Sequence, residues 1–163
     1  PLFKLRVDKF VLNTTAWREP AILRHASREF GAQAVVASID VRRRLFGRYE
    51  VFVEGGSRST GIDPVEYAQR MEAAGAGEIL LTSIDRDGTM KGYELELIAK
   101  VTGAVGIPVI ASGGAGSVSD FGAAIREGGA AAVAAGAMFV FHGPHRAVLI
   151  TYPGVSELAT HLR

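Results

Sequence analysis

The residues best suited to chemistry follow short apolar segments, at the points where strands would end. Asp40 could exchange a proton as a general acid or base. Ser112-Gly113-Gly114 could offer backbone N–H groups to an anion. The other polar or small residues at such points are Asn13, Thr14, Thr82, Asp87, Gly88, Gly136 and Ala137. Because the carboxyl ends of parallel strands meet at one edge of a sheet, we expect a single site there that binds a phosphorylated substrate.

Each of these residues also has a simpler explanation. An aspartate after a strand, such as Asp40, can cap a helix or hold a loop. Ser112-Gly113-Gly114 can be no more than a tight turn. The shared site is favoured because all of the polar exceptions fall at the same end of successive apolar segments.

The elements that must position this site alternate regularly. Short segments rich in Val, Ile, Leu and Ala lie at 9–12, 34–39, 78–82, 107–111 and 130–134. Such segments are typical of strands covered on both faces in a parallel sheet. Amphipathic helices are predicted between them, over 20–30, 63–74, 94–102 and 117–127, with a last helix in 151–163. The alternation predicts an α/β protein built of parallel βα repeats, folded as a single domain over 1–163.

One connection, at residues 41–62, is too long for an ordinary loop between a strand and a helix. Within it, residues 49–54 alternate as an exposed strand does, and Phe46-Gly47-Arg48 could form a turn. We expect a small β-hairpin inserted on the catalytic face. The arginine run 42–44, with Arg48 and Arg58, either forms a solvated face or binds phosphate or a partner.

Composition limits the classes of function. The chain has 163 residues, of which 48% are apolar, and a net charge of +1, so no general attraction to nucleic acid or to an acidic membrane is expected. No apolar run reaches the ~18 residues of a membrane span. The absence of cysteine excludes disulfides and thiolate sites and favours a cytoplasmic setting. His142 and His145 have no carboxylate or cysteine beside them, so we expect neither a metal nor a cofactor.

Three segments of the sequence indicate a particular family, which the alternation of strands and helices alone does not. They are VVASIDV at 35–41, ILLTSIDRDGTMKGYE at 79–94 and IPVIASGGAGS at 107–117. In this order and spacing they resemble the cyclase subunit of imidazole glycerol phosphate synthase, from histidine biosynthesis. DKFVLNTTAWREP at 8–20 is similar to that family's fourth strand and the turn after it. The ending FVFHGPHRAVLITYP at 139–153 looks more like the paralogous cyclases, which work with an amidotransferase in amidino-sugar synthesis for surface polysaccharides.

The resemblance implies a (β/α)8 TIM barrel that uses ammonia from a glutaminase partner. Its substrate is a phosphoribulosyl-formimino aminoimidazole carboxamide nucleotide, which it cleaves to imidazole glycerol phosphate and the aminoimidazole carboxamide ribotide. Two aspartates act as general acid and base, and Asp40 matches the second. By the same match Asn13 and Thr14 help bind one phosphate, while Thr82 and Ser112 line the pocket. The residues matching the other phosphate site are Asp87, Gly88, Gly113, Gly114, Gly136 and Ala137, the last at a position where Ser is common.

A complete barrel of this kind takes roughly 250 residues. The start at Pro1 and the match to strand four suggest a fragment, the C-terminal half-barrel, without the other catalytic Asp. Five parallel strands cannot close such a barrel, so their edges and barrel-facing side chains would meet water. We therefore expect completion by homodimerisation through strand edges, with residues 1–18 displaced, swapped or disordered. Since the family barrel is internally duplicated, Asp40 and its symmetry mate would then lie roughly where the acid and base belong.

Three functions stay open. The first is a cyclase half that works once assembled, with the polysaccharide-pathway paralogue as a variant. The second is a non-catalytic, phosphate-binding half-barrel that self-assembles, which the missing Asp favours for the isolated chain. The third is a phosphosugar isomerase of the same barrel superfamily, which the SIDRDGT motif fits less well.

Overall fold

The computed structural model describes residues 8–162, and its main feature is a seven-stranded sheet. Five strands pair in parallel, in the order β1 (Phe10–Leu12), β2 (Val35–Arg43), β5 (Glu78–Ser83), β6 (Val109–Ser112) and β7 (Ala132–Ala134). The predicted α/β class with a mainly parallel sheet is confirmed. Within the segment expected to be displaced, residues 1–7 lie outside the described residues, and Phe10–Leu12 pair with β2 in this single chain.

The helices follow the strands as the sequence pattern predicts, with two short additions. The predicted ones are α2 (Ala21–Phe30), α3 (Pro64–Ala73), α4 (Leu95–Thr102), α5 (Val118–Arg126) and α7 (Val155–His161). The additions are α1 (Thr14–Arg18) and α6 (Ala137–Val140), with 3₁₀ turns η2 (Ala32–Ala34) and η3 (Leu45–Gly47). Helix α3 begins where the Asp63 carboxylate accepts a hydrogen bond from Val65 N at 2.8 Å. Helix α5 begins with a capping box between Ser117 and Asp120.

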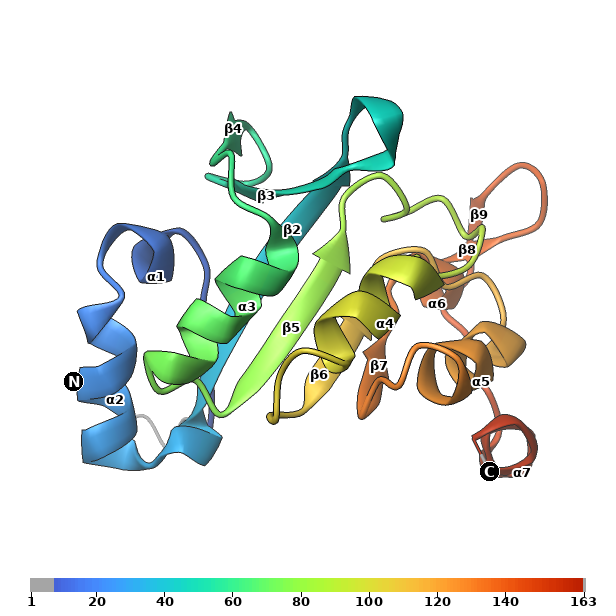
Figure 1. Ribbon diagram of the computed structural model, residues 1–163. Helices are drawn as coiled ribbons and strands as arrows, with labels where there is room; N and C mark the ends of the chain where they lie inside the picture. Colours follow the sequence, from blue (N-terminus) through green and yellow to red (C-terminus); the bar gives the residue numbers. More distant parts are fainter. Residues whose placement is uncertain (1–7, 163) are drawn as a thin grey trace.

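The two faces of the parallel sheet have different surroundings. Ile39, Leu81 and Ala111 point to one face and are at most 1% exposed, beneath the helices. Figure 1 shows α3, α4 and α5 together on one side of the sheet. Their neighbours along the strands, Asp40 and Thr82 among them, point to the opposite face and are only partly buried. The expectation of strands covered on both faces is therefore wrong for the second face, as in a half-barrel whose interior is open.

The long connection forms an antiparallel extension of β2. Strand β3 (Tyr49–Val53) pairs with the last residues of β2, and β4 (Arg58–Ser59) pairs with β3. The expectation that β3 is exposed is wrong, since Tyr49, Val51, Phe52 and Val53 are all buried. The pairing with β2 and the nearby α3 cover it, and neither is visible in the local sequence pattern.

The C-terminal residues form a second, smaller sheet and a last helix. Strands β8 (Phe141–His142) and β9 (Ala147–Val148) form a second, two-stranded sheet that the sequence pattern did not predict. Helix α7 follows and packs against α5, where Arg126 Nη1 donates to the carbonyl of His161 at 2.6 Å. Among residues 8–162, none of the helices is both long and apolar enough to cross a bilayer.

Candidate functional site

A single row of residues crosses the parallel sheet at the carboxyl ends of its strands. Asp40 is the register partner of Thr82, Thr82 that of Ser112, and Ser112 that of Ala134. Register partners in neighbouring strands point to the same face. The row therefore places the Asp40 carboxyl and two hydroxyl groups side by side on the open face of the sheet.

The Asp40 carboxyl is held by Asn13, which follows β1. Asn13 Nδ2 donates to Asp40 Oδ2 at 3.1 Å and to the Ser38 carbonyl at 3.2 Å. Thr14 Oγ1 donates to Asn13 Oδ1 at 3.2 Å and accepts from the Glu54 N–H at 2.9 Å. Because the Asn13 side chain bonds across to β2, it does not cap the helix that follows it. Asn13 and Thr14 thus lie beside Asp40 and fix the direction of its side chain.

The surroundings of Asp40 favour its protonated form. Burial raises its pKa above the ordinary value, the Asn13 amide opposes that rise, and the negative charge of Asp87 adds to it. A carboxyl with a raised pKa holds a proton more readily at neutral pH than an exposed aspartate does. Asp40 is therefore suited to give and take a proton in one reaction cycle.

A cavity of about 260 Å³ lies at the other end of the row. Its lining includes the six residues expected around a phosphate, which are Asp87, Gly88, Gly113, Gly114, Gly136 and Ala137, together with Ser112, one of the two expected to line the pocket. Ala115, Ala134 and Ala135 complete the wall. Sequence reasoning did not name them, although the sheet register identifies Ala134 as the partner of Ser112.

Backbone N–H groups in this cavity are free to bind an anion. Among the described residues, no acceptor takes a hydrogen bond from the N–H of Gly88, Gly113 or Gly114. Gly114 has φ +116°, and a Cβ there would lie 2.3 Å from the Gly92 carbonyl oxygen. The N–H of Gly92 in turn donates to Gly114 O at 2.8 Å. Only glycine therefore allows this turn to pack so closely, and the N–H groups of the buried Gly113 and Gly114 have no acceptor among the described residues.

Comparison with known proteins identifies the family. The family model described as histidine biosynthesis protein matches residues 1–143. The chain belongs to the histidine biosynthesis protein family. The putative imidazole glycerol phosphate synthase subunit hisF2 of Pseudomonas aeruginosa is 47% identical over 157 residues, which is 96% of this chain and 62% of that protein. The HisF subunit of Alkaliphilus metalliredigens is 50% identical over 141 residues, 86% of this chain and 56% of that protein. That of Metallosphaera sedula is 55% identical over 136 residues, 83% of this chain and 53% of that protein.

This member of the histidine biosynthesis protein family is thus a HisF homologue, as the resemblance implied. The chain spans little more than half the length of the curated relatives it matches. The match to hisF2 is long enough to include residues 144–153, which lie beyond the family model.

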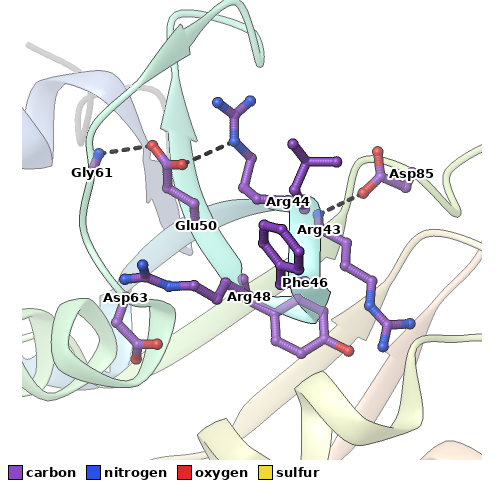
Figure 2. Close-up of a pocket in the computed structure, with 10 residues that line it drawn as sticks. Arg43, Arg44, Phe46, Arg48, Glu50, Gly61, Asp63 and Asp85 are labelled. Carbon is purple, nitrogen blue, oxygen red and sulfur yellow. Dashed lines mark hydrogen bonds and ion pairs between the residues drawn. The ribbon is translucent and has the colours of Figure 1, made fainter.

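Another cavity of this HisF homologue, of about 950 Å³, is lined by the hairpin and lies away from the row (Figure 2). Its arginines are mostly paired: Arg44 Nε lies 3.2 Å from Glu50 Oε2, and Arg43 lies 3.7 Å from Glu96. The backbone N–H of Arg43 donates to Asp85 Oδ2 at 2.7 Å. A phosphate would have to displace these carboxylates, so the pairing favours the solvated-face explanation of the arginine run.

Within residues 8–162, no group of three or more His, Asp or Glu side chains is arranged to hold a metal ion. The chemistry available at the row is proton transfer by Asp40 and anion binding by the backbone.

Proposed function

We propose that this chain is a cyclase-type lyase half-barrel of the imidazole glycerol phosphate synthase family. Its reaction uses ammonia on a phosphoribulosyl-formimino aminoimidazole carboxamide nucleotide and gives imidazole glycerol phosphate for histidine biosynthesis. The observation that carries the proposal is the row Asp40–Thr82–Ser112, which joins a proton-exchanging carboxyl to an anion cavity.

In this proposal the cavity anchors one end of the substrate. The phosphate lies against the free N–H groups of Gly88, Gly113 and Gly114. The rest of the substrate extends along the open face past Thr82 to Asp40, which exchanges the proton at the reacting atom. Asn13 holds the Asp40 carboxyl in place through the hydrogen bond from its Nδ2. Asn13 and Thr14 stand where a second phosphate of the substrate would be bound.

The partners in this proposal are a second copy of the chain and a glutaminase subunit. Asp40 is one carboxyl, and acid–base chemistry at two points needs another. A homodimer formed through the strand edges supplies Asp40 of the second copy and covers the open face of the sheet. The glutaminase supplies ammonia, and the setting of the reaction is the cytoplasm.

A second candidate is a non-catalytic half-barrel that binds phosphate and self-assembles. It is supported by the cavity itself, whose backbone N–H groups without an acceptor can bind phosphate without any catalysis. The amidino-sugar cyclase paralogue is a variant of the first proposal, favoured by the sequence of the C-terminal segment 139–153.

Ammonia-dependent turnover of the formimino nucleotide separates these functions, because added ammonia removes the need for a glutaminase. We expect the wild type to be active and Asp40→Asn to be slower by about 10²- to 10⁴-fold, the usual contribution of a general acid or base. Arg28→Gln, an exposed change on α2, serves as the control and keeps wild-type turnover. An inactive wild type that phosphate still stabilises against heat would favour the second candidate. Full activity in Asp40→Asn would overturn the assignment of Asp40.

A further inference from the structure

The charges around the anion cavity are unfavourable for a bound phosphate. Of the residues that line it, Asp87 carries a negative charge and none carries a positive one, among those the structure describes. Neutral N–H groups alone would have to offset the repulsion between this carboxylate and a phosphate dianion. A cation at the rim of the cavity would relieve that repulsion.

Arg146 is the cation that the fold brings to this rim. It lies in the turn between β8 and β9, and its Nη2 donates to the carbonyl of Gly88 at 3.0 Å. Gly88 itself lines the cavity. The Arg146 guanidinium also lies 4.6 Å from the centre of the Phe141 ring, which limits its movement.

The hairpin that carries Arg146 is anchored to the cavity at its other end. It follows α6, whose first residue, Ala137, is part of the cavity wall. Two backbone hydrogen bonds of 2.9 Å, from Leu149 to Val140 and from Thr151 to Phe139, hold the returning chain against α6. In Figure 1 the β8–β9 hairpin stands beside the loop that follows β5. The segment 137–146 thus begins at Ala137 in the cavity wall and comes back to the cavity where Arg146 bonds to Gly88.

We propose that Arg146 binds the phosphate group held in this cavity and positions the Gly88 loop around it. The bond to Gly88 uses only part of the guanidinium, so further N–H groups are available to a phosphate oxygen. Arginine suits this role because its planar guanidinium stays charged and matches phosphate geometry. The inference rests on the proposed function and adds to it a residue beyond the family model, which ends at residue 143.

The test measures binding of inorganic phosphate to the full chain by titration calorimetry. We expect Arg146→Gln to weaken the affinity by about three- to ten-fold, as loss of one charged hydrogen bond at an exposed site would. Arg146→Lys keeps the charge, so its affinity for phosphate should lie between that of the wild type and that of Arg146→Gln. Arg28→Gln removes the same charge from an exposed site on α2 and should bind phosphate as the wild type does.

Two further measurements separate binding from a merely structural role. Added phosphate should raise the melting temperature of Arg146→Gln by less than that of Arg28→Gln, whereas a merely structural role would lower the melting temperature of Arg146→Gln equally with and without phosphate. The affinity of Arg146→Gln for phosphate should also depend less steeply on salt than that of the wild type. Equal phosphate affinity in Arg146→Gln and Arg28→Gln overturns the role of Arg146 alone. A wild type that does not bind phosphate overturns the proposed cavity, and the role of Arg146 with it.

Discussion

At the scale of single residues, the proposed role of Asp40 in proton exchange comes with a cost to stability. Burial, the largest cause, raises the pKa of Asp40, and the charge of Asp87 adds to the rise. Between the unfolded and the folded pKa, the folded chain binds more protons than the unfolded chain does. The contribution of Asp40 to stability is therefore full below the unfolded pKa and is lost as pH rises through the folded pKa.

This linkage predicts that Asp40→Asn stabilises the protein at neutral pH. Asparagine keeps an oxygen that can accept from Asn13 Nδ2 and carries no charge to bury. The gain in free energy of unfolding should be largest at pH 7 and should shrink as pH falls toward 4. Urea denaturation at a series of pH values measures it. A variant less stable than the wild type at pH 7, or a gain that grows in acid, would contradict the raised pKa.

Phe46 has a strained backbone conformation, which lowers the stability of the folded protein. Its φ is +62° and its side chain is 99% exposed, so an aromatic residue adopts the left-handed conformation with no packing in return. Asparagine tolerates this conformation better than other residues with a Cβ. We expect Phe46→Asn to raise the free energy of unfolding by about 0.5–1 kcal/mol. Phe46→Ala keeps the strain and should change stability by less than about 0.5 kcal/mol in the same urea titration; equal effects of the two substitutions would argue against strain.

At the scale of elements, the hairpin is fastened to α4 through Tyr49. The Tyr49 hydroxyl lies 3.1 Å from Glu94 Oε1 and 3.3 Å from Glu96 Oε2, and donates to these carboxylates. Burial, followed by the charge of Glu94, raises the pKa of Tyr49, which keeps the hydroxyl protonated as a donor. The ring is buried at the start of β3. The contact fixes the hairpin beside the row that contains Asp40.

Removing this hydroxyl should loosen the hairpin. We expect Tyr49→Phe to lower the free energy of unfolding by about 1.5–3 kcal/mol, the usual range for a hydrogen bond to a charged group. Hydrogen exchange of the β3 amides should also become faster. Tyr152→Phe is the matched control, because Tyr152 is 74% exposed and its hydroxyl has no hydrogen bond among the described residues. If both variants unfold alike, the bonds from Tyr49 do not hold the hairpin.

The elements also show what the sequence could and could not predict. Strands and helices whose signals are local, such as α3 with its Asp63 cap, were predicted close to their observed bounds. Burial of β3 was missed because it depends on pairing with β2, and α1 was missed because Asn13 bonds to Asp40 instead of capping the helix. Most of the residues that line the cavity were predicted because they lie in the loops that follow apolar strands. Arg146 was not, since its partner Gly88 lies 58 positions earlier in the chain.

At the scale of the whole molecule, the open face and the open edges of the sheet both favour association with another chain. Strands β1 and β7 stand at the ends of the parallel part, and among residues 8–162 neither has a partner strand on its outer side. Val11 on β1 is the register partner of Val36 and is 54% exposed, on the same face as Asp40. Unpaired edges beside exposed apolar side chains favour association with another chain. Pairing of β1 with β7 of a second copy would satisfy both edges and bury Val11.

This arrangement predicts how Val11→Lys behaves in sedimentation velocity. In the single chain the position is exposed, so the substitution should change monomer stability by less than about 0.5 kcal/mol. In the closed dimer the ammonium group would lose its water without a partner, so the dimer dissociation constant should rise by at least about ten-fold. Leu45→Lys, at an 82% exposed position on the hairpin turn away from β1 and β7, should leave the dimer unchanged. A wild type that stays monomeric at micromolar concentration, or a Val11→Lys dimer as tight as the wild type, would mean that this edge does not pair, and the second carboxyl of the proposed site would have to come from elsewhere.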